Sequence, residues 1–186
     1  MPKMIARREI FLLIVSMLAM AATARQSEAA TASEIEGDVN ATLNRFYGQV
    51  RGSRDLAGRA AGILVFPSIV KAGIGIGGEY GEGALRVKGK TAGYYNSVSA
   101  SIGFQLGVQA RSVIIMFMTE DALASFRRKN GWKVGVDGSV ALITLGAGGS
   151  IDSNQISKPV IGFILDEKGL MYNLTLEGSK ISRISR

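Results

Sequence analysis

Glycine is concentrated in one part of the chain, and this restricts the fold more than any other feature. Twelve of the 24 glycines lie between Gly58 and Gly107, interleaved with apolar side chains. Because glycine weakens strand interiors, this pattern indicates tight curvature, bulges or another backbone packed closely on the glycine face. We expect a strongly curved antiparallel sheet. Two sets of residues would each share a strand face: Ile74, Ile76 and Gly78, and Ile102, Phe104 and Leu106.

An amphipathic helix is predicted over residues 33–50. Ser33 is a plausible N-cap, and two glutamates follow it in the first turn. The apolar stripe can pack on a core or lie in a membrane interface; the sequence leaves both open and favours the core. The stripe consists of Ile35, Val39, Leu43, Phe46, Tyr47 and Val50.

Residues 54–61 predict a second, short helix. The β-branched run at residues 62–67 predicts a buried strand that Pro67 ends. Residues 110–118 predict another strand, and Thr119 follows it as the N-cap of a helix. That helix closes with Arg127, Arg128 and Lys129 ahead of Asn130 and Gly131.

The C-terminal third predicts further strands. Short glycine-punctuated strands are expected within residues 132–149, at the pairs Val134/Val136, Val140/Leu142 and Ile143/Leu145. Residues 160–165 and 170–176 predict two strands around a turn at 166–169. The order of helices and strands predicts an α+β fold: a curved, glycine-rich, mostly antiparallel sheet or partial barrel with an N-terminal amphipathic helix and one internal helix.

Composition limits the chemistry of the chain. It has neither histidine nor cysteine, which removes disulfides, thiolate nucleophiles, the Ser-His-Asp triad and the commonest ligands of zinc and other transition metals. Carboxylate, lysine, tyrosine or serine chemistry and hard-cation binding remain. We therefore expect a binding protein and not an enzyme, with no cofactor and no metal.

Two motifs that could carry chemistry are better explained as structure. Residues 73–78 contain G-x-G-x-x-G, but no helix-forming run follows and no acid lies between Glu82 and Glu120, so dinucleotide binding is not expected. The carboxylate pairs Glu79/Glu82 and Asp166/Glu167 have no third ligand or arginine clamp in the sequence. We interpret both pairs as solvated turn carboxylates.

The first thirty residues resemble an export signal. Basic residues precede an apolar run of about 13 residues, too short to cross a bilayer, and small residues follow it. We predict a cleaved signal peptide at residues 1–30, with the mature start between Arg25 and Thr31, and hence a periplasmic or exported protein peripheral to the membrane. Arg7 and Arg8 fit either a twin-arginine signal or an ordinary basic n-region, so the export route stays open.

Positive charge is a property of the domain itself. The chain carries a net charge of +7, and residues 31–186 alone carry +5, which indicates an anionic partner. Nucleic acid is not expected, because no basic strand face is interleaved with aromatics. Two groups of cations are the candidate lipid-binding residues: Arg45, Arg51, Arg54 and Arg59 near the N-terminal helix, and Arg127, Arg128 and Lys129 at the end of the second helix, where helix-dipole compensation is the alternative.

Three ordered blocks resemble the SYLF domain, also called the Ysc84-like domain. They are residues 60–67 continued by 71–83, residues 101–109, and residues 169–170 with 176–181. The resemblance implies a SYLF-like domain at residues 56–186, preceded by the amphipathic helix region at 31–55. It also implies phospholipid binding, for which the family's N-terminal helix and basic residues are implicated.

The expected function is therefore that of an exported, non-enzymatic domain that binds anionic phospholipid head groups at a membrane surface. The alternative is an envelope structural or adaptor protein that binds another protein through its glycine-rich sheet. The sequence does not name the native lipid.

Overall fold

The computed structural model describes residues 30–103, 109–143, 151, 156–165 and 176–186, without the side chains of 72–76 and 101–109. The chain divides into two compact units, Met1–Ala30 and Thr31–Arg186, and every element below belongs to the second.

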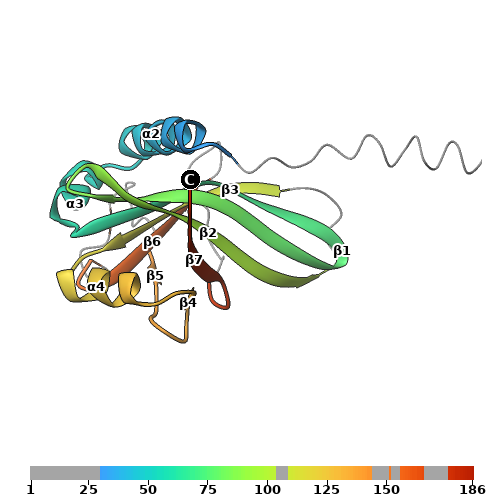
Figure 1. The fold of residues 1–186 in the computed structure, drawn as a ribbon. Helices are drawn as coiled ribbons and strands as arrows, with labels where there is room; N and C mark the ends of the chain where they lie inside the picture. Colours follow the sequence, from blue (N-terminus) through green and yellow to red (C-terminus); the bar gives the residue numbers. More distant parts are fainter. Residues whose placement is uncertain (1–29, 104–108, 144–150, 152–155, 166–175) are drawn as a thin grey trace, which may run out of the picture. The chain divides into compact units, whose positions relative to one another are not determined.

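The second unit is built on one curled sheet (Figure 1). Its strand order is β4-β7-β2-β1-β3-β6-β5, and the pairs are antiparallel except for β5 with β6. The predicted α+β class with a mostly antiparallel, curved sheet is confirmed. The strands are β1 (Gly62–Val87), β2 (Lys90–Gly103), β3 (Gln109–Phe117), β4 (Trp132–Lys133), β5 (Ala141–Leu142), β6 (Val160–Leu165) and β7 (Lys180–Ile184).

Glycines let the two halves of β1 lie against each other. A Cβ added at Gly83 would lie 1.9 Å from the carbonyl oxygen of Val65, and one at Gly81 would lie 2.6 Å from that of Ser68. No side chain fits where a backbone approaches so closely. The expectation of a backbone packed on a glycine face is confirmed at these positions.

The prediction that Pro67 ends a strand is wrong. β1 continues through Pro67, and its pairing with β3 shifts register between Phe66 and Ile69. Proline has no N–H to donate to the ladder, and a bulge is a place where a strand tolerates this loss.

Helix α2 (Ala32–Gln49) packs its apolar stripe on the sheet. Ile35, Val39, Phe46 and Val50 are at most 3% exposed, so this part of the stripe belongs to the core. The predicted cap at Ser33 is wrong. Thr31 caps the helix instead, since its hydroxyl accepts from the Glu34 N–H at 3.2 Å while Glu34 accepts from the Thr31 N–H at 2.7 Å.

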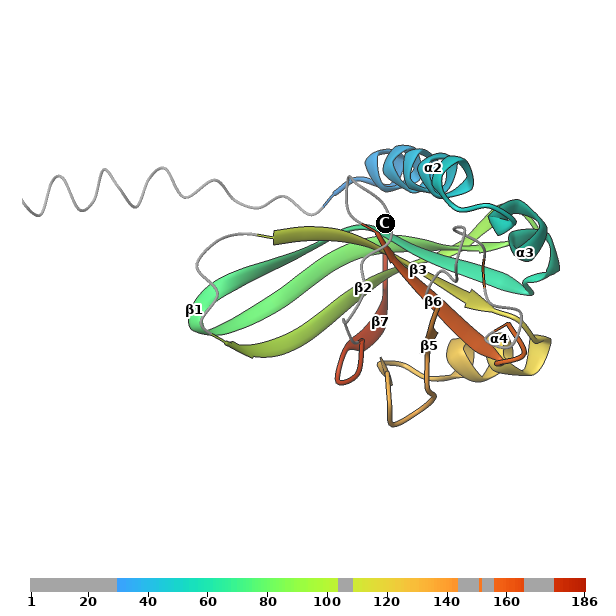
Figure 2. The same ribbon diagram turned by 180° about the vertical axis from the view of Figure 1, so that it is seen from behind.

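The other two helices lie near their predicted positions. Helix α3 (Ser53–Arg59) follows α2 directly, and α4 (Glu120–Arg128) begins after the predicted Thr119 cap. In both views α2 and α4 lie on opposite sides of the sheet (Figures 1 and 2). Phe126 of α4 contacts the rings of Tyr95 and Trp132 at centroid distances of 5.0 and 5.6 Å. These ring contacts fix the C-terminal end of α4 beside β2.

The C-terminal third agrees with prediction in part. The strand at 160–165 is confirmed, and Leu142 lies in β5 as expected, whereas Val140 and Ile143 flank that strand and are not part of it. A strand at Val134/Val136 is wrong, because the chain turns there: Gly135 has φ +87° and the Asp137 carboxylate accepts from the Lys133 N–H at 2.8 Å. Leu145, the turn at 166–169 and nearly all of the strand predicted at 170–176 lie outside the described residues. Strand β7 was not predicted.

Candidate functional site

The first group of candidate cations does not form one surface. Arg45 turns toward the sheet, where its guanidinium donates to the Ser112 hydroxyl at 2.5 Å. That hydroxyl in turn donates to the Pro67 carbonyl at 2.6 Å. Arg45 is thus part of the α2–sheet contact, whereas Arg51 and Arg59 are exposed on and before α3.

Arg54 lines a cavity of about 500 Å³ between α2, α3 and the end of β1. We call it the second cleft, because a larger one is described below. The guanidinium of Arg54 stacks over the Tyr47 ring, 4.7 Å from the centroid. Burial raises the pKa of Tyr47, and the charge of Arg54 opposes that rise. The second cleft has apolar and cationic walls: Asn40, Leu43, Tyr47, Arg54, Ala57, Gly58, Ala60, Ile63, Arg86, Lys88 and Gly89.

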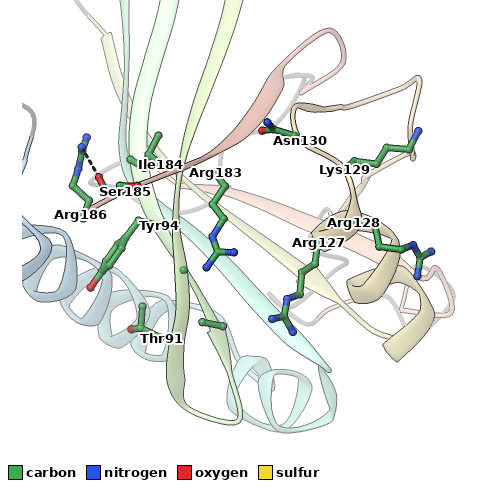
Figure 3. Close-up of a pocket in the computed structure, with 12 residues that line it drawn as sticks. Thr91, Tyr94, Arg127, Arg128, Lys129, Asn130, Arg183, Ile184, Ser185 and Arg186 are labelled. Atoms are coloured by element: carbon green, nitrogen blue, oxygen red, sulfur yellow. Dashed lines mark hydrogen bonds between the residues drawn. The ribbon is translucent and has the colours of Figure 1, made fainter.

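The second group of candidate cations opens onto a larger cavity of about 750 Å³, which we call the basic cleft. It lies between the end of α4, the start of β2 and the end of β7 with the two residues that follow it (Figure 3). All three predicted residues of this group line it. The lining residues are Thr91, Ala92, Gly93, Tyr94, Arg127, Arg128, Lys129, Asn130, Arg183, Ile184, Ser185 and Arg186.

Arg183 enters the basic cleft because β7 pairs with β2. The register places Arg183 opposite Tyr95, and its guanidinium crosses Gly93, where an added Cβ would lie 3.2 Å from Arg183 Nε. Burial raises the pKa of Tyr95, and the charges of Arg183 and Arg127 oppose that rise. The positive charges of both arginines therefore act on Tyr95. Figure 3 shows their guanidinium groups pointing in a common direction.

Two of the five cations in the basic cleft are paired with acids. Lys129 Nζ lies 2.5 Å from Asp137, and this contact together with the Lys133 N–H holds the pKa of Asp137 below its ordinary value. Arg186 pairs with Glu82. Within the described part of the chain, Arg127, Arg128 and Arg183 take part in no ion pair, so three positive charges of the cleft are not compensated there.

The interpretation of Glu79 and Glu82 as solvated carboxylates is wrong. Arg111 clamps Glu79 with two contacts, at 2.6 and 3.1 Å, and both side chains are at most 12% exposed. Glu82 is 9% exposed and accepts from Tyr80 as well as from Arg186. Their arginine partners lie more than thirty residues away in the sequence, which is why spacing did not reveal them. Asp166 and Glu167 lie outside the described residues.

Sequence reasoning also missed Arg183 and Arg186. Residues 180–186 contain three cations and no acid, which was a detectable signal of a basic segment. Their place in the cleft nevertheless depends on the β2–β7 register, which no local pattern indicates.

The described residues offer little for other chemistries. They hold no group of three acidic side chains able to bind a metal ion, and none of their helices is long and apolar enough to span a membrane.

A comparison with protein families agrees with the resemblance. The model of the Ysc84 family, described as Las17-binding protein actin regulator, matches residues 98–185. The SYLF or Ysc84-like resemblance is thus confirmed over this segment, which includes β3, α4 and β7 and four of the five cations of the basic cleft. A comparison with curated proteins found no match.

Proposed function

We propose that this chain, with its Ysc84-family segment at residues 98–185, is a non-enzymatic domain that binds anionic phospholipid head groups in its basic cleft. The observation that carries the proposal is that Arg127, Arg128 and Arg183 line one open cavity without acidic partners in the described structure. Of these, Arg127 and Arg183 point the same way (Figure 3). The family's description names binding and regulation and no reaction, which supports a binding role.

Arginine suits this role physically. Its planar guanidinium is always charged and donates hydrogen bonds in a fork that matches phosphate oxygens. An open cleft also lets a head group enter while the lipid remains in its bilayer. The net charge of +5 on residues 31–186 adds a longer-range attraction to an anionic surface.

The proposal includes export. Residues 1–30 have the three zones of a signal peptide, so we expect the mature domain on the far side of the cytoplasmic membrane, peripheral to its lipid. The intact mass of the protein from a periplasmic fraction should lack this segment. Full-length protein retained in the inner membrane would refute cleavage.

Liposome cosedimentation tests the lipid site. Wild type should bind phosphatidylglycerol or cardiolipin vesicles but not phosphatidylcholine alone, and added salt should weaken binding, because screening limits the attraction to about 8 Å at physiological ionic strength. Arg127→Glu/Arg183→Glu should bind at least about 30-fold more weakly, since each cation contributes roughly 1 kcal/mol at an anionic surface.

The matched control is Lys133→Glu/Lys180→Glu, which makes the same charge change at two exposed residues outside the basic cleft. It should retain most of the binding. Equal losses in the two double variants would show that net charge matters and the cleft does not. Circular dichroism confirms that each variant is folded.

A protein contact through the glycine-rich sheet is the second candidate function. Tyr80 and Val98 are register partners on β1 and β2, and they are 49% and 46% exposed. Two neighbouring apolar side chains on a sheet surface favour a protein partner. Failure of wild type to bind any anionic vesicle, together with loss of a captured partner in Tyr80→Ser/Val98→Ser, would support this function over lipid binding.

A further inference from the structure

We propose that the β1–β2 turn, formed by Lys88 and Gly89 and followed by Lys90, is the tip with which the domain meets the membrane. This inference rests on the proposed function and adds the orientation of the bound domain. None of these residues was singled out by the sequence patterns, and the turn lies outside the segment that matches the family.

The turn stands between the two clefts. Lys88 and Gly89 line the second cleft, while the basic cleft begins at Thr91, only two residues further along the chain. Figure 3 shows the start of β2 with Thr91 lying between α2 and the arginines of α4 and β7. One end of the sheet therefore presents Lys88 and Lys90 with a cationic cavity on either side.

The acidic side chain between the clefts is already satisfied. Glu36 of α2 lies 2.6 Å from the Arg86 guanidinium and accepts hydrogen bonds from Thr91 at 2.5 Å and Tyr94 at 3.1 Å. Arg86 lines the second cleft and Tyr94 lines the basic cleft, so this network connects the two clefts. Because Glu36 is paired, its charge does not cancel that of the turn.

The two lysines of the turn are exposed, and in the described structure neither takes part in an ion pair. Val87 pairs with Lys90, which leaves a two-residue loop. Lys88 and Gly89 have φ of 51° and 76°, the positive values that such tight hairpin turns require. The tip is thus held rigidly by the β1–β2 ladder, and no ordering of a loose loop opposes its contact with a surface.

The geometry points to a bilayer as the occupant because the cations are spread over two cavities and the ridge between them. A single small anion would fill one cavity, whereas a surface of many head groups can engage both cavities and the ridge at once. Asp55, exposed in the first turn of α3 beside Arg54, is an acidic exception at this end.

The chain provides a matched control outside both clefts, at Lys133 and Lys180. Lys180 pairs in register with Val98 of β2. Val98 follows Lys90 by eight residues, which is about 26 Å along an extended strand. Lys133 pairs with Lys180, and both are exposed. Lys133→Glu/Lys180→Glu and Lys88→Glu/Lys90→Glu therefore change the net charge equally at two separated places.

The experiment is cosedimentation with phosphatidylcholine vesicles that contain phosphatidylglycerol. Each cation at an anionic surface contributes roughly fivefold in affinity, so Lys88→Glu/Lys90→Glu should weaken binding at least about 30-fold. Lys133→Glu/Lys180→Glu should weaken it about threefold or less. Equal losses, or a larger loss in the control, would overturn the orientation.

Fluorescent labels give a second readout that does not depend on charge. The chain has no cysteine, so a single introduced thiol takes the label. Gly58→Cys lies in the second cleft where an added Cβ meets nothing within 4 Å, and Val136→Cys replaces a residue that is 78% exposed. A polarity-sensitive label should respond to anionic vesicles at position 58 and not at 136, and the reverse result would refute the proposal.

The outcomes separate this inference from the proposed function. If wild type binds no anionic vesicle, both are refuted. If wild type binds and Arg127→Glu/Arg183→Glu weakens binding, but the turn variant behaves like its control, the lipid site stands and only the orientation is wrong. If the turn variant loses vesicle binding as expected but wild type binds a soluble acidic polypeptide equally tightly, a membrane partner is overturned in favour of a protein.

Discussion

Replacing Gly83 by alanine is the sharpest test of how the glycine-rich strand is folded. The added methyl carbon would lie 1.9 Å from the Val65 carbonyl oxygen and 2.9 Å from the Phe66 ring, whereas ordinary contact begins near 3.4 Å. One half of β1 must therefore move by about 1.5 Å against a close-packed neighbour. Overpacking costs about 1–3 kcal/mol, and a backbone obstacle puts this substitution at the upper end.

Gly37→Ala is the matched control, because it makes the same chemical change in the interior of α2, where an added Cβ meets nothing within 4 Å. It should stabilise the domain by about 0.5–1 kcal/mol, since alanine loses less backbone freedom than glycine in a helix. The two substitutions are thus expected to change the free energy of unfolding in opposite directions.

Urea unfolding measures the stability of both variants. The signal is the fluorescence of Trp132, which is buried and is the only tryptophan of the chain. With a slope of about 2 kcal/mol/M, the midpoint should fall by about 1.5 M for Gly83→Ala and rise by about 0.3–0.5 M for Gly37→Ala. An unchanged midpoint and slope in Gly83→Ala would mean that the halves of β1 do not meet at Val65.

Three further predictions concern α2 and its contact with the sheet. Burial opposes ionisation of Glu36, but hydrogen bonds from Thr91 and Tyr94 and the charge of Arg86 together hold its pKa below the ordinary value. The stability that ionised Glu36 contributes is therefore present above about pH 4.3 and is lost as the pH falls through the lower pKa of the folded state. Urea midpoints of the wild type should fall on acidification, and those of Glu36→Gln should fall less. Ser112→Ala should cost about 1–3 kcal/mol by leaving the Arg45 guanidinium without its hydroxyl partner, whereas Arg51→Ala should stay within about 0.5 kcal/mol; equal urea midpoints would refute the difference. Phe46→Ala should lower the free energy of unfolding by about 3–5 kcal/mol, and Leu43→Ala, at a half-buried position, should lower it less. Equal small losses in the two variants would show that the apolar stripe of α2 is not part of the core.

Local signals account for the elements that were predicted well. The α4 helix begins after its cap Thr119, whose hydroxyl accepts from the Ala122 N–H, and it ends among cations that suit its dipole. The six buried residues of β6 form a continuous apolar run, which is the pattern of a strand covered on both faces. Each of these signals lies within about ten residues of the element it specifies.

Competing local signals explain the small errors. Ser33 and Thr31 are both good N-cap residues, and each has a glutamate three positions later. Glu34 completes the reciprocal pair with Thr31. Glu36 instead binds Arg86, Thr91 and Tyr94 of the sheet. Pro67 is a strand breaker in an isolated segment, yet the long pairing of β1 with β3 absorbs it at a bulge. The outcome in each case was decided by a partner that the single residue does not reveal.

Only the part of the candidate site that comes from one continuous segment of the sequence was predicted. The cations at the end of α4 were identified, because a run of three is visible in the sequence, but Arg183 joins them through pairing with β2 across nearly ninety residues. The side-chain period of a strand is two, so a slip of one residue in that pairing would send Arg183 to the other face of the sheet and Ser182 into the cleft. Arg45 shows the converse, since it was grouped with Arg51, Arg54 and Arg59 by position and is separated from them by the hydrogen bond to Ser112. The charge of the basic cleft is therefore set by composition, while its shape is set by the register of β2 with β7. A family member could keep every arginine and lose the site by a shift of one residue in that register.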